Sequence, residues 1–147
     1  MDSPSLKVGA GIVIVKDGKT LLTKRRGSHA AGCWQCVGGH VEFGESPMET
    51  VKREAHEELG IEIGNLRLAA CTNMIKYGKH YLDLTFAAEI LVGEPRIIEP
   101  EKMEEIRWFP LDELPEPLFE PIRIALEARR TGEVYFEIKE INECVCP

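Results

Sequence analysis

The sequence predicts one α+β domain, and three observations lead to this fold class. The chain has 147 residues, a usual size for a single compact domain. Segments with strand character alternate with turn signals, and two segments have the apolar spacing of amphipathic helices. No internal repeat and no low-complexity linker divides the sequence. We therefore expect a single domain over residues 1–147.

The first predicted elements are a β-hairpin and a short strand. Residues 8–16 alternate small and β-branched side chains, Asp17-Gly18 is a two-residue hairpin signal, and residues 20–26 are the returning strand. A loop over residues 27–32 leads to a short apolar segment, residues 34–37. We expect Gly38-Gly39 to break this segment, because glycine weakens a strand.

Residues 47–59 are predicted to form the first helix. Ser46 suits the N-cap, Pro47 suits the first helical position, and Glu49 is placed to complete a capping box. Gly60 follows the helix at the position where a left-handed residue commonly ends one.

The second half predicts three strands and a second helix. Residues 66–75 and 80–91 have the pattern of strands joined by a turn at Gly78, and residues 106–109 are a short strand after an acidic segment. In residues 121–130 the apolar spacing indicates an amphipathic helix, through Ile122, Ile124, Ala125 and Ala128. The tail, residues 134–147, gives no firm prediction.

Composition and charge exclude several classes of protein. The net charge is −7, from 25 acidic and 18 basic residues, which argues against binding of duplex nucleic acid by phosphate neutralisation. A metal ion can still join an acidic protein to a small phosphorylated ligand. No apolar run approaches the roughly 20 residues of a membrane span, and the first residues lack a signal-peptide pattern. We expect a cytoplasmic protein without membrane contact, whose five cysteines are reduced thiols.

Three glutamates share one side of the first predicted helix. At about 100° per residue, Glu57 and Glu58 lie about 60° and about 40° to either side of Glu54. Such crowding is unfavourable without compensation, and a hard divalent cation such as Mg²⁺ compensates it because Mg²⁺ prefers oxygen ligands. A neighbouring arc of the helix is expected to face the core, with Met48, Val51, Ala55 and Leu59.

The segment around these glutamates resembles the Nudix box, the signature of the Nudix hydrolase family. Residues 39–61, here called the box, read Gly, five residues, Glu, seven residues, Arg-Glu, an apolar residue, any residue, Glu-Glu, any residue, Gly and an apolar residue. Three clustered glutamates alone are more often a solvated helix face, but Gly39, Glu45, Arg53 and Gly60 also stand at the required spacing. The resemblance implies the Nudix fold, a mixed β-sheet sandwiched between α-helices.

The resemblance assigns metal ligands and a cofactor. Glu54 and Glu58 would bind Mg²⁺ or Mn²⁺ directly, and Glu57 would bind it directly or through water. The carbonyl of Gly38 would be a further ligand, while Gly39 permits a tight backbone turn beside the substrate. The family usually has Leu-Pro before the two glycines, where this chain has Cys36-Val37, so the loop is less pre-organised.

The same resemblance implies a catalytic group without a protein nucleophile. Water attacks phosphorus, and a carboxylate positions or deprotonates that water. Glu57 is the first candidate for this base and Glu104, in a later acidic segment, is the second. Arg53 would orient the carboxylates through an ion pair with Glu45 or Glu57.

Substrate contacts are expected just outside the helix. Arg25 and Arg26 end the second strand, and alternation leaves one of them facing the box loop, for which we choose Arg25. His40 follows the box glycine and is either a ligand contact or a polar loop residue. The wider pattern resembles the MutT-like branch, which hydrolyses nucleoside triphosphates to monophosphate and pyrophosphate and commonly forms homodimers. ADP-ribose or a dinucleoside polyphosphate is the alternative substrate.

Other readings of the sequence are weaker. Gly18-Lys19-Thr20 lacks the earlier glycine of a P-loop, and Gly9-Ala10-Gly11 lacks the third glycine of a dinucleotide fingerprint. A zinc or redox site from Cys33/Cys36 and Cys144/Cys146 has unsuitable spacing and surroundings. A non-catalytic nucleotide-binding sensor remains the alternative of another class, although such modules tend to lose box carboxylates and none is lost here.

Overall fold

The computed structural model describes residues 4–27, 31–76 and 78–139, and these residues form two sheets and two helices. The helices are α1 (Pro47–Leu59) and α2 (Glu120–Thr131). The strands are β1 (Leu6–Val13), β2 (Val15–Lys16), β3 (Lys19–Arg25), β4 (Trp34–Gln35), β5 (Gly38–His40), β6 (Glu62–Lys76), β7 (Lys79–Val92), β8 (Met103–Pro110) and β9 (Tyr135–Lys139).

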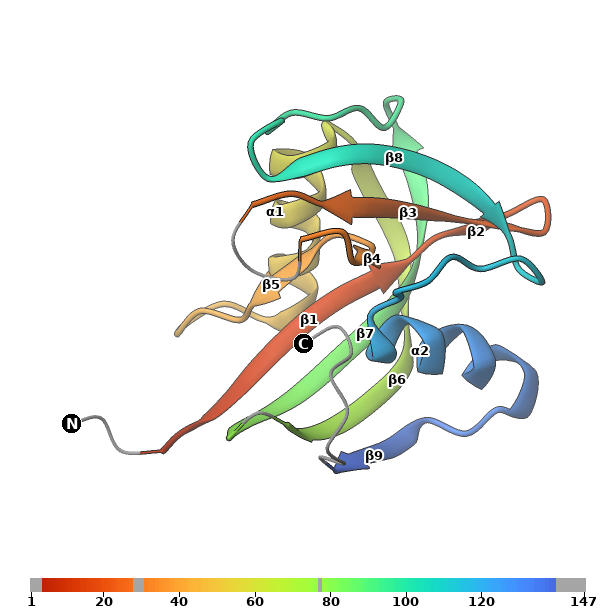
Figure 1. Cartoon of the computed structure of the whole chain (residues 1–147). Helices are drawn as coiled ribbons and strands as arrows, with labels where there is room; N and C mark the ends of the chain where they lie inside the picture. Colours follow the sequence, from red (N-terminus) through yellow and green to blue (C-terminus); the bar gives the residue numbers. More distant parts are fainter. Residues whose placement is uncertain (1–3, 28–30, 77, 140–147) are drawn as a thin grey trace.

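The larger sheet is mixed and has the strand order β5-β1-β7-β6-β9. Pairs β1–β7 and β6–β9 are parallel, whereas β1–β5 and β6–β7 are antiparallel. Helix α1 packs against β1, β5 and β6, and α2 packs against β1, β6 and β7 on the other face (Figure 1). The expectation of a mixed sheet between helices is therefore confirmed. In the smaller sheet β3 pairs with β2, β4 and β8.

The predicted hairpin turn is confirmed by its backbone angles. Asp17 and Gly18 have φ of 51° and 74°, and two successive positive φ values give the turn whose twist matches the flanking strands. The short pair β2–β3 follows directly, with Val15 opposite Thr20.

Helix α1 begins and ends where the sequence predicts. The Ser46 hydroxyl accepts a hydrogen bond from the Glu49 N–H at 3.1 Å, and Gly60 has the left-handed φ of 67°. Val51, Ala55 and Leu59 are fully buried. Met48 is 43% exposed, so its predicted place in the core is wrong. The first turn of α1 buries Thr50 instead, whose hydroxyl donates to Glu45 Oε1 at 2.7 Å and ties that turn to the preceding loop.

The expected break at Gly38-Gly39 is also wrong, because both glycines lie in β5. Gly38 and Gly39 pair with Gly11 and Ala10 of β1. A Cβ on Gly38 would lie 2.5 Å from the carbonyl oxygen of Ala10. The absence of side chains therefore allows the close strand approach that places the loop before α1.

Two strands are longer than predicted, and one strand was not predicted. β6 and β8 are longer than the apolar patterns that predicted them, and β9 forms within the tail that gave no firm prediction. Neither helix in the described part of the chain is long and apolar enough to cross a membrane.

Candidate active site

Arg53 of α1 gathers the carboxylates of the box. Its Nε and Nη2 donate to the two oxygens of Glu45 at 2.8 and 3.1 Å, and its Nη1 lies 2.9 Å from Glu54 Oε1 and 3.4 Å from Glu57 Oε2. The sequence expected a pair with Glu45 or Glu57, and the structure shows both. A planar guanidinium suits this bidentate geometry, which fixes the side chains around it.

The charges of this cluster are strongly coupled. Hydrogen bonds from Arg53 and then Thr50 lower the pKa of Glu45 to about 2, so its carboxylate stays ionised. The Glu45 carboxylate in turn raises the pKa of Arg53 above its usual value. Glu45 and Arg53 thus form a permanently charged pair between the box loop and α1.

Glu58 has a different environment. Its Oε2 atom is buried and has no hydrogen-bond partner among the described residues. Burial, followed by the neighbouring Glu54 and Glu99 carboxylates, raises the pKa of Glu58 to about 8, and Arg25 acts in the opposite direction. A carboxyl group with one buried, unpartnered oxygen and two neighbouring carboxylates is suited to binding a cation.

The carboxylates do not form a complete cation cage by themselves. Within residues 4–27, 31–76 and 78–139, no three histidine, cysteine, aspartate or glutamate side chains are grouped closely enough to hold a metal ion. Arg53 engages one oxygen each of Glu54 and Glu57. Gly39 lies against Glu54, because a Cβ on Gly39 would be 2.9 Å from Glu54 Oε1. The backbone of β5 therefore approaches the carboxylates where the sequence expected the Gly38 carbonyl.

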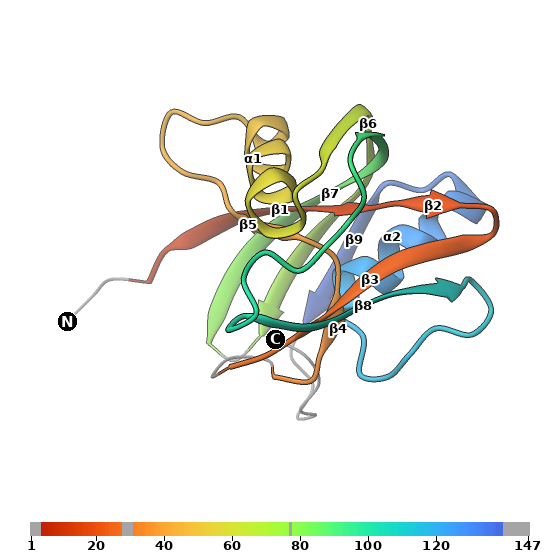
Figure 2. The ribbon, with the colours of Figure 1, turned by 90° about the horizontal axis from the view of Figure 1, so that it is seen from above.

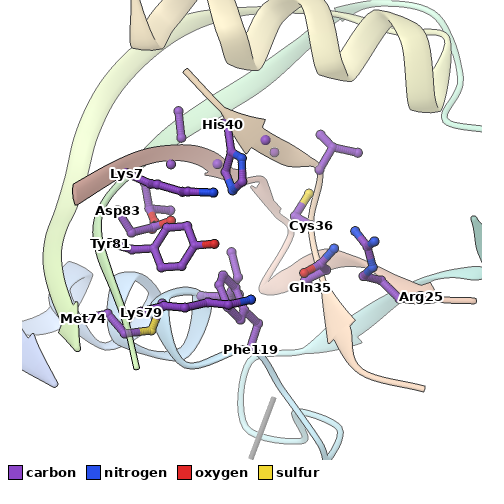
Figure 3. A pocket seen from close by; sticks show the side chains of 18 of the residues that line it. Lys7, Arg25, Gln35, Cys36, His40, Met74, Lys79, Tyr81, Asp83 and Phe119 are labelled. Atoms are coloured by element: carbon purple, nitrogen blue, oxygen red, sulfur yellow. The ribbon is translucent and has the colours of Figure 1, made fainter. Parts of the chain in front are cut away.

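A cavity of about 570 Å³ lies on the α2 side of the larger sheet and includes Gly38, Gly39, His40 and Arg25 in its wall (Figure 3). The structure thus brings together the substrate-contact residues that the sequence singled out. The Arg25 Nε is buried without a hydrogen-bond partner among the described residues, whereas Arg26 lies 3.8 Å from Glu104. Strand alternation separates the two arginines as expected.

Glu104, the second candidate for the base, is engaged by two basic side chains, and Glu99 lies nearer to the box. Glu104 forms ion pairs with Lys24 at 3.1 Å and with Arg26 at 3.8 Å. Glu99 instead acts electrostatically on Glu58 and shares the wall of a second cavity, of about 500 Å³, with Glu57. Glu99 is therefore the carboxylate from the later segment that approaches the box.

Backbone hydrogen bonds hold Glu99 at this place. The segment from β7 to β8 passes along the C-terminal end of α1, as Figure 2 shows from above. Arg96 N–H donates to the Leu59 carbonyl at 3.1 Å, and Ile98 N–H donates to the Glu58 carbonyl at 3.3 Å. The run of acidic residues 99–105 was a sequence signal for this segment, but it did not distinguish its members.

Asp83 is a second residue that the sequence analysis missed. It lies in β7 in the wall of the 570 Å³ cavity and is 9% exposed. Burial raises its pKa to about 6, against the effect of a hydrogen bond from Thr85. The available signal was an aspartate flanked by Leu82 and Leu84 within a predicted strand.

Cys33 takes part in a disulfide whose partner is not Cys36, so the expectation that all five cysteines are reduced thiols is wrong. Cys33 and Cys36 are both buried, and Cys36 is a free cysteine whose pKa is raised by burial to about 12. A thiol with this pKa is a poor nucleophile and metal ligand. Cys144 and Cys146, the other two cysteines of the zinc or redox site considered from the sequence, lie outside the described residues.

Comparison with known proteins agrees with this arrangement. The NUDIX domain model matches residues 5–129. The chain is 36% identical to the NAD-capped RNA hydrolase NudC of Pseudomonas aeruginosa over 113 residues, which are 77% of this chain and 38% of that protein. It is 31% identical over 137 residues to the mouse mitochondrial NAD(P)H pyrophosphatase NUDT13, covering 92% of this chain and 36% of that protein. The chain thus spans less than half the length of these curated relatives.

One solved structure is similar to this chain over almost its entire length. The crystal structure of the MutT NUDIX hydrolase from Burkholderia pseudomallei matches with a TM-score of 0.80 and 41% identity, over 84% of this chain and 98% of that chain. With a family model that matches most of its length and every position of the box filled, the chain belongs to the NUDIX domain family.

Proposed function

We propose that this protein is a Mg²⁺-dependent hydrolase that cleaves the diphosphate linkage of a nucleotide-like substrate. The observation that carries this proposal is the buried Glu58 Oε2 atom, which has no hydrogen-bond partner among the described residues, beside Glu54 and next to a cavity large enough for one nucleoside. The mouse relative is a pyrophosphatase by its name, and the bacterial relatives are hydrolases of NAD-capped RNA, which supports the same class of reaction.

Four groups would hold the metal, namely the carboxylates of Glu54, Glu57 and Glu58 and the carbonyl of Gly38. Bound Mg²⁺ would neutralise phosphate charge and lower the pKa of water. Two features of the chain fit this cation: the Glu58 oxygen lacks any partner in the described structure, and the Gly39 backbone leaves room for the Glu54 carboxylate. Arg53, held by the ionised Glu45, would keep Glu54 and Glu57 oriented.

The attacking water needs a carboxylate that is free to accept its proton. Glu57 is exposed at the edge of the cluster and remains our first candidate. Glu99 replaces Glu104 as our second candidate, since Glu104 is already paired with two cations. Arg25 and His40, in the wall of the adjoining cavity, would contact the substrate phosphates.

The finer proposal is that the substrate is a nucleoside triphosphate, or a modified one, cleaved to monophosphate and pyrophosphate. This substrate is favoured by the similarity to a MutT NUDIX hydrolase, which extends over 98% of that hydrolase's chain. A dinucleotide such as NAD is the second candidate, because two relatives are named for NAD-containing substrates.

The test is product release from nucleoside triphosphates, NADH, ADP-ribose and dinucleoside polyphosphates, with Mg²⁺ and with chelator. We expect Mg²⁺-dependent pyrophosphate release from a triphosphate. Glu58→Gln should lose most of this activity, while Glu104→Gln, a matched change outside the cluster, should retain it. Turnover of NADH alone would contradict the triphosphate substrate and support the proposed cleavage of a diphosphate linkage. Binding of nucleotides without any Mg²⁺-stimulated hydrolysis would refute the enzyme and favour a sensor module.

A further inference from the structure

The 570 Å³ cavity has a polar floor on the larger sheet. Asp83 of β7 accepts a hydrogen bond at Oδ2 from the Thr85 hydroxyl at 2.9 Å. Asp83 and Thr85 both line the cavity, whereas Thr72 of β6, which pairs in register with Asp83, does not. Burying a carboxyl group costs free energy unless hydrogen bonds compensate it, and a single donor is little compensation. This floor is therefore equipped to receive a polar group of a ligand.

A glycine keeps the space beside the carboxyl group open. Gly9 of β1 pairs in register with Asp83, and a Cβ at Gly9 would lie 3.1 Å from Asp83 Oδ1. Oδ2 is the oxygen that Thr85 occupies. Oδ1 is therefore the oxygen available for a ligand in the cavity.

The walls suit a flat heterocycle with an anionic end. The rings of His40 and Tyr81 lie 5.5 Å apart at an angle of 33°, and the cavity continues toward Phe119. Figure 3 shows Asp83 and Tyr81 on one side of the cavity, with Arg25 on the other side near Gln35 and Cys36. A nucleoside placed with its base on the floor would thus direct its phosphates toward Arg25 and the glutamates of α1.

We propose that Asp83 selects bases that carry an exocyclic amino group, by accepting a hydrogen bond from that group at Oδ1. The inference rests on the proposed function, because it concerns the base of the same substrate. An ionised carboxylate only accepts hydrogen bonds, so adenine, cytosine or guanine amino groups satisfy it. A base with a carbonyl oxygen at that position would place two acceptors together and leave Asp83 Oδ1 without a donor.

Calorimetric titration of the metal-free protein with nucleoside monophosphates at pH 8 tests this selection without involving hydrolysis. The pairs are AMP/IMP, CMP/UMP and GMP/IMP. AMP and CMP carry an amino group where IMP and UMP carry a carbonyl oxygen beside a ring N–H, and GMP carries a 2-amino group that IMP lacks. We expect the amino member of at least one pair to bind about 10-fold or more tightly than its partner. Asp83→Asn, which offers a donor as well as an acceptor, should reduce that preference to less than about 3-fold.

Lys79→Gln is the matched control within the same cavity. It should weaken both members of a pair equally, because it removes a charge rather than the contact to the base. Thermal unfolding of Asp83→Asn establishes that the variant is folded, and Asp83→Ala provides a second variant.

Equal affinities within every pair for the wild type, no binding of any monophosphate, or an unchanged preference in folded Asp83→Asn would each overturn the inference. Hydrolysis without base preference would overturn this selection and leave the proposed function standing. Base preference without hydrolysis would support this selection and contradict the proposed function.

Discussion

Two adjacent glycines of β5 offer a sharp test of how the site is built. Gly38→Ala would place a Cβ 2.5 Å from the Ala10 carbonyl oxygen and 2.9 Å from the Gly11 Cα, both backbone atoms of the paired strand. Gly39→Ala would place a Cβ 2.9 Å from Oε1 and 3.2 Å from Cδ of Glu54, which are atoms at the end of a flexible side chain. The same substitution one residue apart should therefore damage different properties.

The magnitudes follow from what must move. At Gly38 the shortfall is about 0.9 Å against an ordinary contact of 3.4 Å, and β1 and β5 have to separate. We expect a loss near the upper end of overpacking costs, about 3 kcal/mol, or about 6 to 12 °C in Tm for a chain of this size. At Gly39 only the Glu54 side chain has to move, which costs its ion pair with Arg53 but no backbone shift, so stability should change by less than about 1 kcal/mol. Displacing one proposed metal ligand should lower kcat/KM about 10- to 100-fold.

Thermal unfolding and Mg²⁺-dependent hydrolysis measured on both variants give the comparison. Gly11→Ala is the control, because its Cβ would meet the Val37 carbonyl oxygen at an ordinary distance of 3.6 Å. A Gly38→Ala protein as stable as the wild type would refute the close strand approach. A fully active Gly39→Ala protein would refute the position of Glu54 at the reacting groups.

Three further predictions concern the acidic residues and the helix cap. Glu99→Gln should lower kcat about 10-fold or more, while Glu104→Gln changes it less than about 3-fold; the reverse order would return the role to Glu104. The raised pKa of Asp83 means that the folded state binds more protons than the unfolded state between pH 3.8 and about 6, so stability falls as pH rises through that window. We expect the free energy of unfolding of Asp83→Asn, measured with denaturant, to rise by about 3 kcal/mol relative to that of the wild type between pH 4 and pH 6. Parallel pH profiles of the two proteins would contradict this. Ser46→Ala should lower the free energy of unfolding by about 1 kcal/mol, because it removes the N-cap hydrogen bond from the Glu49 N–H. An unchanged denaturation midpoint would show that this hydrogen bond does not stabilise the protein.

The box and its helix could be predicted from the sequence because their determinants are local. Ser46, Pro47 and Gly60 bound α1 through hydrogen bonds and backbone angles within a few residues. The pairing of Arg53 with Glu45 and Glu57 also follows from spacing, since all three lie within or just before one helix. The positive φ values at Asp17 and Gly18 are likewise a property of that dipeptide between two strands.

Other features depend on contacts between distant parts of the chain. Gly38-Gly39 has the composition of a break, yet it forms a strand because β1 accepts it at a distance that only glycine allows. Met48 has the spacing of a core residue, but no other element covers that part of α1 closely enough to bury it. Periodicity assigns a residue to a face of a helix, and tertiary packing determines whether that face is covered.

The family and the carboxylate helix could be predicted from the sequence alone, because both reside in short-range spacing within residues 39–61. The approach of Glu99, rather than Glu104, to Glu58 and the place of Asp83 in a cavity wall became apparent only from the fold. Both outcomes depend on where strands separated by tens of residues meet, and the physical reason is that side-chain electrostatics acts through space. The alternatives within one acidic run are equivalent in sequence and differ only in the partners that the fold brings to them.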